Sequence, residues 1–292
     1  MKKPLFILAA LLLGLCFPYF ERFQEVIRYF LMIILFFSFL KLKLSWRMFQ
    51  WRHLLLLLAS IGLSLSGYFL VLPFDEMLAQ SVFLVAIAPT AIAAIIFADL
   101  FRVDLGFVTA AVIVSNLFAV VTIPLSFTYL IKTAVAVNVF ELLKAVFITV
   151  VIPLITSQLL ILTRSRLVNF FNRIQWFPFV LFCINIFIAS AKASYFLRYE
   201  SDAPWRAVAI IVGAMMMLCV IGFQVGKRVS GKNLAIEGSL ALGRKNTMFT
   251  IWLATTYLQP IVVIAPTAYI LIQNAYNAWQ LGRVEKQNSL EV

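Results

Sequence analysis

The sequence predicts an all-α integral membrane protein with ten transmembrane helices, arranged as two inverted five-helix repeats. Its residues are 63% hydrophobic and 12% charged, with a mean hydropathy of +1.01, whereas soluble domains are about 45–50% apolar and about 25% charged. Apolar runs of about 20 residues alternate with short charged loops, as in membrane-spanning helices. Similar features recur in the two halves of the chain. The composition excludes a soluble enzyme, a nucleic-acid-binding protein and a disordered chain.

Charged residues, prolines and glycines delimit the predicted spans. Lys2 and Lys3 precede the first apolar stretch. We interpret this stretch as a helix and not a cleaved signal, because Leu15, before Cys16, is not the small residue that such signals carry. The short loops leave no room for a separate extramembrane domain. The predicted spans cover residues 4–20, 25–40, 52–72, 78–100, 105–131, 138–162, 174–196, 205–225, 233–257 and 260–281.

The basic residues predict the orientation of the chain. It contains 24 Lys and Arg against 12 Asp and Glu, a net charge of +12. With ten spans, both termini lie on the same side, and the segments on that side carry about twice as many Lys and Arg as those on the other. Because cytoplasmic loops are enriched in Lys and Arg, we expect both termini in the cytoplasm.

Two pairs of features, one member in each half, indicate an internal repeat. Trp51-Arg52 opens the third span, and Trp205-Arg206 opens the eighth. The interruptions at Pro89 and Arg244 are separated by nearly the same number of residues as these two Trp-Arg pairs. An odd number of spans per repeat inverts the second copy, which is the plan of secondary transporters with a substrate site at broken helices near the membrane midplane. The predicted domains are a first repeat over 1–134, a second over 135–282 and a short cytoplasmic tail over 283–292.

Two of the spans are interrupted at their centres. Pro89 removes a backbone hydrogen bond from the fourth span, and Arg244 and Lys245 lie at the centre of the ninth. A charge at the bilayer centre costs about 2.5–3.5 kcal/mol and usually marks a substrate or ion pathway. Gly243 makes unwinding easy there, and a half-helix starting near Asn246 directs its positive end at the cavity. These features predict an anionic substrate. The alternative is a structural pairing of the two cations with Glu237, Asp99 or Glu141.

The chain resembles the bile acid:sodium symporter family over nearly its whole length, in particular its bacterial members. The matching features are the ten spans, the second span at residues 31–43, the Pro89 break, Gly243-Arg244-Lys245-Asn246 and the end of the last span, Gln273 to Asn277. The resemblance implies a panel domain of spans 1, 2, 6 and 7 and a core domain of spans 3–5 and 8–10. It also implies crossing broken helices, alternating access and a multi-pass bacterial inner membrane location.

The departures from the family pattern concern sodium. The sodium-binding Glu of the ninth span falls on Ala241 and its Gln falls on Lys245, while Ala94-Ile95 and Tyr68 replace further polar ligands. Sodium needs several oxygen ligands, by analogy with other hard cations. We therefore expect no cofactor or metal, doubt that sodium binds, and expect the Lys245 ammonium to replace the coupling ion. Transport would then be facilitative or coupled to protons through Lys245 or a nearby carboxylate. The coupling-ion region comprises Tyr68, Ala94, Ile95, Ser115, Ala241, Arg244 and Lys245.

The resemblance also implies a set of substrate contacts, for which interhelical hydrogen bonding is the alternative role. These residues are Thr90, Asn246, Thr247, Gln273 and Asn274. The predicted function is transport of organic anions, either bile-acid-like compounds or small carboxylates. Alternatives are a sodium-coupled symporter of such anions and a non-transporting membrane sensor with the same fold. Apart from the substrate and the lipid bilayer, we expect no nucleic acid and no obligate protein partner. With a single histidine and no phosphate-binding loop, the chain lacks the motifs of an enzyme.

Overall fold

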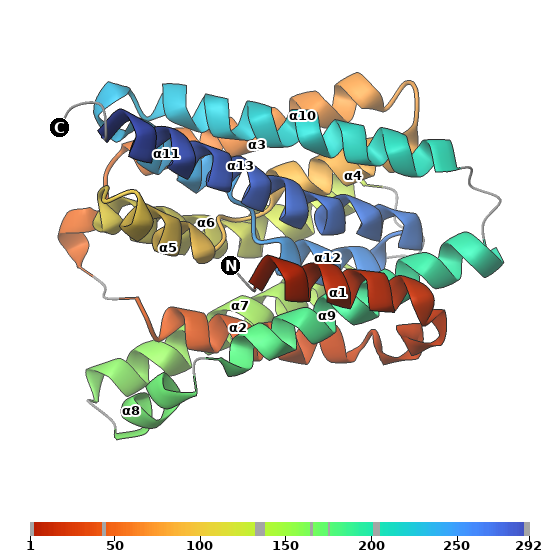
Figure 1. The fold of residues 1–292 in the computed structure, drawn as a ribbon, viewed down its shortest axis with the longest axis horizontal. Coiled ribbons are helices and arrows are strands. Elements are labelled where there is room, and N and C mark those ends of the chain that lie inside the picture. Colours follow the sequence, from red (N-terminus) through yellow and green to blue (C-terminus); the bar gives the residue numbers. More distant parts are fainter. Residues whose placement is uncertain are drawn as a thin grey trace. The chain divides into compact units, whose positions relative to one another are not determined.

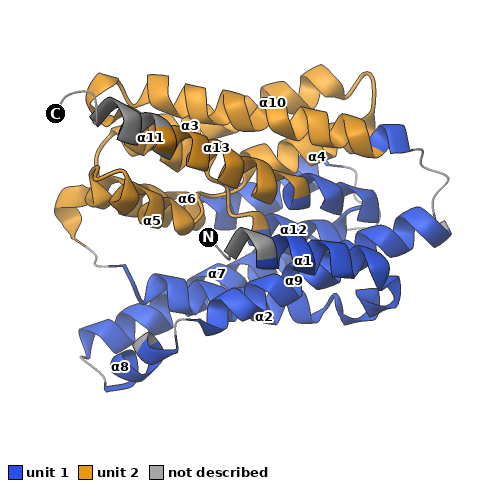
Figure 2. Ribbon diagram, in the orientation of Figure 1, with its two compact units in different colours: residues 1–43, 117–207, 248–267 blue, residues 44–116, 208–247, 268–292 orange. Residues whose placement is uncertain are grey.

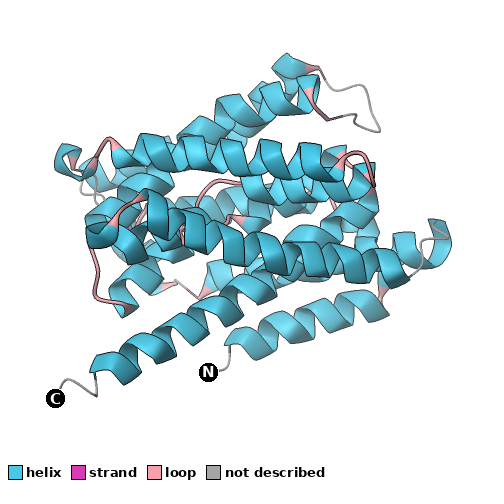
Figure 3. Ribbon diagram, turned by 90° about the horizontal axis from the view of Figure 1, so that it is seen from above, coloured by secondary structure: helices cyan, strands magenta, loops and turns pink. Residues whose placement is uncertain are grey.

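The computed structural model describes residues 3–42, 45–131, 138–163, 166–174, 176–200 and 205–288. Within these ranges the chain consists of helices and their connecting loops, with no β-strand (Figure 3). Lys43, the last residue of the segment that matches the family's second span, and residues 289–292 of the predicted tail lie outside the described residues. The all-α prediction is therefore confirmed for the part of the chain that the structure describes.

The helices are labelled in chain order in Figure 1. Short 3-10 turns precede α2, α3, α11 and α13, and a π-helical turn, Phe196–Glu200, follows α9. The α-helices are α1 (Lys3–Cys16), α2 (Val26–Phe39), α3 (Arg52–Val71), α4 (Glu76–Ile87), α5 (Ala93–Leu100), α6 (Leu105–Tyr129), α7 (Val139–Leu162), α8 (Arg166–Arg173), α9 (Phe177–Tyr195), α10 (Trp205–Val229), α11 (Ala235–Gly243), α12 (Thr247–Tyr257) and α13 (Ile264–Asn288).

Among the described residues, six helical segments are long and apolar enough to cross a membrane. They are Arg52–Val71, Leu105–Tyr129, Val139–Leu162, Phe177–Tyr199, Trp205–Val229 and Pro260–Gln280. Shorter apolar helices cover Phe6–Cys16, Val26–Phe39 and Glu76–Ile87. The predicted fourth and ninth spans each appear as two half-helices, α4 with α5 and α11 with α12, because the chain leaves the helical conformation at their centres.

Local chemistry explains where the first half-helix begins and ends. The side chain of Asp75 caps α4 by accepting a hydrogen bond from the Leu78 N–H at 2.8 Å. The helix ends at Ile87 because Ala88 precedes Pro89 and adopts an extended conformation, with φ −52° and ψ 140°. A residue before proline is pushed out of the α region by the proline ring.

The chain divides into two compact units, coloured separately in Figure 2. Unit 1 contains residues 1–43, 117–207 and 248–267, and unit 2 contains residues 44–116, 208–247 and 268–292. Predicted spans 1, 2, 6 and 7 of the panel domain fall in unit 1. Spans 3 and 4 of the core domain, and span 8 from residue 208 onward, fall in unit 2. The boundary runs through α6 and α13, and α12 belongs to unit 1 from Met248 onward.

Each unit has its own helix packing. In unit 1, α1 packs on α9, and α2 packs on α7 and α9. In unit 2, α3 packs on α4, and α11 contacts α5 and α3. The two half-helices of unit 2 are enclosed, since α4 is buried from Ala79 to Ile87 and α11 from Glu237 to Gly243. Unit 2 therefore places both helix breaks in its interior.

Candidate substrate and ion site at the helix breaks

The two helix breaks pair with each other through their backbones. The Ala91 N–H donates to the Arg244 carbonyl at 2.9 Å, and the Asn246 N–H donates to the Pro89 carbonyl at 2.8 Å. Thr90 and Lys245 thus form an isolated antiparallel bridge. Backbone groups inside a membrane protein need internal partners, and here each break supplies the partners that the other has lost.

Side chains complete the hydrogen bonding around Thr90, a predicted substrate residue. Its N–H donates to the Ser115 hydroxyl at 3.0 Å, and its own hydroxyl donates to the Ala241 carbonyl at 2.6 Å. The Asn116 amide donates to the Thr90 carbonyl at 3.2 Å. Three predicted residues, Thr90, Ser115 and Ala241, are therefore brought together, and the Thr90 hydroxyl hydrogen is already used within the protein.

α13 supports the second break through two polar side chains. The Gln273 amide oxygen accepts from the Lys245 N–H at 3.0 Å, and the amide nitrogen donates to the Lys245 carbonyl at 3.4 Å. The Tyr269 hydroxyl donates to the Gly243 carbonyl at 2.8 Å. In this conformation Gln273 makes the interhelical hydrogen bonds that were the alternative to substrate contact.

The Lys245 side chain is 3% exposed and ends among oxygen atoms. Its Nζ donates to the Ala86 carbonyl at 2.6 Å, the Ser60 hydroxyl at 3.1 Å and the Ala88 carbonyl at 3.2 Å. The two carbonyls belong to the C-terminal end of α4, where the last carbonyls of a helix lack intrahelical partners. This end also carries the negative pole of the helix dipole, which stabilises a cation.

The Arg244 side chain is also 3% exposed but is incompletely bonded. Its Nη2 donates to the Asn274 amide oxygen at 3.0 Å, and its Cζ lies 4.1 Å from the centre of the Phe97 ring. Its Nε and Nη1 atoms are buried and have no hydrogen-bond partner among the described residues. A buried charge with unmet hydrogen bonds is costly, and these two nitrogen donors are unused in this structure.

The backbone explains why the two adjacent cations have different surroundings. Arg244 has an extended conformation, with φ −89° and ψ 106°, and its neighbour forms the antiparallel bridge. Successive side chains of an extended chain point to opposite sides. Lys245 accordingly reaches α3 and the end of α4, whereas Arg244 reaches α5 and α13.

The remaining predicted residues lie at varying distances from the two paired helix breaks. Asn246 and Thr247 are buried beside Lys245, at 9% and 4% exposure. Ala94 and Ile95 occupy the first turn of α5. Tyr68 packs against Phe83, edge to face, with ring centres 5.8 Å apart. It lies two turns, about 12 Å, beyond Ser60 along α3 at 1.5 Å per residue, so Ser60 is the α3 residue that contacts the Lys245 ammonium.

Two sequence-based interpretations need correction. Glu237, a candidate acidic partner of the two cations, instead accepts a hydrogen bond from the Asp104 N–H at 3.1 Å. Gly243 is required for packing and not for unusual backbone freedom: a Cβ there would lie 2.3–2.5 Å from the Phe223 ring. Among the described glycines only Gly231 has a positive φ.

Sequence reasoning missed four residues that contact the paired helix breaks or their two cations. Ser60 and Phe97 look like ordinary members of apolar helices, and Tyr269 like a common aromatic of a membrane span. Asn116 carried a signal, since a buried amide directly after Ser115 needs a partner. Their roles depend on contacts with Lys245, Arg244 and the broken backbone, which lie far away in the sequence.

Comparison with known proteins gives one family. The model of the Sodium Bile acid symporter family matches residues 30–198, more than half of the chain. A comparison with curated proteins gave no match. The matched segment contains the break at Pro89 and ends before the break at Arg244. With its several apolar helices, this multi-pass membrane protein belongs to the sodium bile acid symporter family.

Proposed function

We propose that the chain is a secondary transporter of organic anions, bile-acid-like or small carboxylates, that works without sodium. It crosses the inner membrane ten times as two inverted repeats, 1–134 and 135–282, with both termini in the cytoplasm, and operates by alternating access. The antiparallel pairing of two breaks at matching positions of the two halves supports this plan, because such breaks form the substrate and ion sites of inverted-repeat transporters.

The surroundings of Lys245 are the observation that carries the proposal. Three oxygen atoms, two of them helix-terminal carbonyls, bind its ammonium. Carbonyls at unwound or terminal helix segments are the groups that bind coupling cations in broken-helix transporters. A covalently attached cation in such a place makes a dissociable one unnecessary.

The local charges favour an anionic substrate. Arg244 and Lys245 contribute two positive charges, and their hydrogen-bonding partners among the described residues are neutral oxygen atoms. α12 begins at Thr247, two residues after Lys245, so the positive pole of its helix dipole adds to the positive charge of the two side chains.

Uptake into proteoliposomes tests the proposal. Radiolabelled cholate and benzoate serve as probes, with sodium or choline as the external cation. We expect the wild-type protein to accumulate at least one probe equally in both salts. Lys245→Gln, which removes the fixed charge, should make uptake depend on sodium. A steep sodium dependence of the wild-type protein would refute the proposal.

Sodium-coupled symport of organic anions is the second candidate, favoured by membership of a family named for that activity. Backbone carbonyls would then have to supply the sodium ligands that the side chains lack. The same uptake experiment separates the two candidates, because this one predicts sodium dependence already in the wild-type protein.

A further inference from the structure

Arg244 has unused hydrogen-bonding capacity that Lys245 does not have. A guanidinium carries five N–H donors in a planar fork, and among the described residues only the Asn274 amide oxygen accepts from it. Asn274 uses one of the two N–H groups on Nη2. The other, together with either Nε or Nη1, forms a complete two-donor edge. The structure therefore leaves at least one bidentate edge of Arg244 unoccupied.

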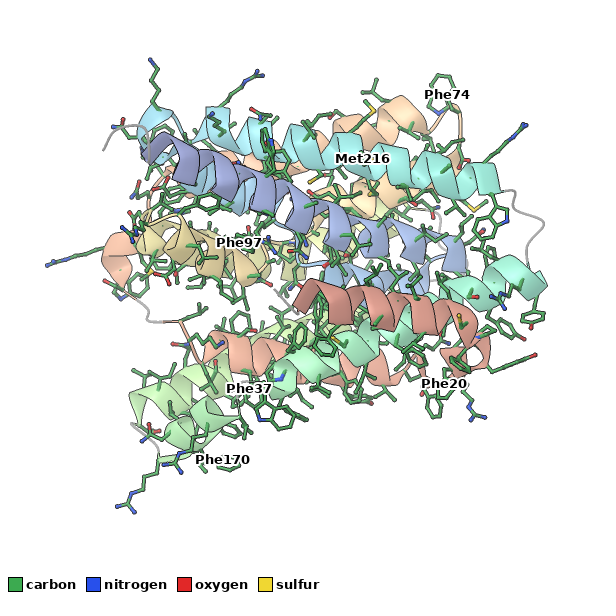
Figure 4. All side chains as sticks on the ribbon, in the orientation of Figure 1. Phe20, Phe37, Phe74, Phe97, Phe170 and Met216 are labelled. Atoms are coloured by element: carbon green, nitrogen blue, oxygen red, sulfur yellow. The ribbon has the colours of Figure 1, made fainter. Side chains whose placement is uncertain are left out.

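The surroundings restrict which ligand can use this edge. Phe97 lies on α5 (Figure 4), and its ring centre is 4.1 Å from the Cζ atom of Arg244. Such stacking leaves the planar edge of the guanidinium as the route of approach. Two parallel N–H groups match the two oxygens of a carboxylate. Phe97 and Asn274 are both neutral, so the single charge of Arg244 is compensated by one negative charge.

We propose that Arg244 is the anion-binding residue of the transport site, and that its unoccupied edge receives one carboxylate group of a substrate whose apolar part lies against Phe97. This inference rests on the proposed transport of organic anions and specifies its substrate class: monocarboxylates.

The inference also separates the roles of the two cations. Lys245 remains bound to α3 and α4, while Arg244, which the sequence placed in the coupling-ion region, binds the substrate. Because both unpaired nitrogens are shielded from water, the carboxylate enters when the site opens to one side of the membrane.

Matched ligand pairs test the charge requirement. Thermal unfolding of the purified full-length protein is measured with benzoate against benzamide, and with cholate against its neutral carboxamide. We expect the wild-type protein to be stabilised by at least one acid and not by the corresponding amide. Arg244→Gln should lower the affinity for that acid by more than about tenfold, because it removes a charge-assisted bidentate pair. Arg244→Lys retains the charge but loses the fork, and should recover only part of the affinity.

A second variant keeps the inference testable if substitutions at Arg244 impair folding. Asn274→Asp places a carboxylate at the position that contacts Nη2, so the protein supplies its own anion. We expect the ligand-free protein to become more stable while its affinity for the added acid falls more than about tenfold. A purely structural role for Arg244 predicts the gain in stability without the loss of affinity.

Two control variants isolate the effect. Gln224→Glu adds a carboxylate elsewhere in unit 2, where Gln224 contacts the Tyr276 hydroxyl at 3.1 Å. Arg28→Lys changes an arginine of unit 1 that is bonded to Thr149 and Ala145. Neither should change the affinity for the acid.

The possible failures are distinguishable. If no acid stabilises the wild-type protein better than its amide, both the inference and the proposed anion transport are wrong. If the preference for the acid persists in Arg244→Gln and Asn274→Asp, only the role of Arg244 is wrong. If these variants lose their affinity for the acid while wild-type uptake depends on sodium, the role of Arg244 stands and the sodium-independent mechanism is wrong.

Discussion

Replacing Lys245 by methionine tests whether a fixed cation holds the end of α4. The methionine side chain is unbranched and one atom shorter than that of lysine, so the variant removes the ammonium and leaves its position open. The Ala86 carbonyl retains the Ser60 hydroxyl as a donor at 3.0 Å, whereas the Ala88 carbonyl loses the Lys245 hydrogen bond. One buried acceptor without a partner costs about 1–3 kcal/mol. Removal of a buried charge acts in the opposite direction, so we expect a net loss of about 1 kcal/mol in the free energy of unfolding.

Sodium should reverse this loss in the variant. Without the ammonium, the hydroxyl of Ser60 and the carbonyls of Ala86 and Ala88 remain as oxygen ligands. A cation that binds only the folded state stabilises it by RT ln(1 + [cation]/Kd), which is about 1.4 kcal/mol at ten times Kd. Chemical and thermal unfolding are therefore compared in sodium and choline chloride at equal ionic strength.

The expected pattern has two parts. Wild-type stability does not change between the two salts, and Lys245→Met is weakened in choline and recovers in sodium. Lys232→Met, at an exposed position of the same unit, serves as the control and should respond to neither salt. Stabilisation of the wild-type protein by sodium, or an unchanged Lys245→Met in choline, would refute the reasoning.

Two further predictions concern the backbone near the site. Gly243→Ala should destabilise the protein by about 1–3 kcal/mol in thermal unfolding, because the new Cβ overlaps the Phe223 ring; combining it with Phe223→Leu should recover part of the loss, and two additive losses would show that the ring is not the cause. Arg102 follows the end of α5 with a φ of 56°, and the Val103 N–H donates to the Ala98 carbonyl at 3.1 Å. This is a helix-terminating geometry in which glycine is the usual residue. Arg102→Gly should raise the free energy of unfolding by about 1 kcal/mol. A lower midpoint of thermal unfolding in this variant would contradict the explanation.

The positions of the two breaks were predictable because they arise from local chemistry. Pro89 has no N–H, and its ring excludes the helical conformation for Ala88, so α4 must end near Ile87. Two adjacent cations at the centre of the ninth span likewise indicate an interruption, and α11 ends at Gly243.

The detailed roles around the breaks were not predictable from local chemistry. The family resemblance placed Arg244 and Lys245 together in the coupling-ion region. The pairing of Thr90 with Lys245, 155 residues apart in the sequence, makes the segment extended and separates the two side chains. The position assigned to Tyr68 required the register between α3 and α4, which no local pattern specifies. The structure instead brings Ser60 to the ammonium.

Simultaneous measurement of anion and sodium entry tests the central claim most directly. Proteoliposomes containing the wild-type protein are supplied with radiolabelled sodium and with whichever of cholate and benzoate is taken up. Our account predicts that anion entry leaves sodium entry unchanged, because Lys245 already provides the positive charge at the helix breaks. Sodium entry in a fixed ratio to the anion would contradict it.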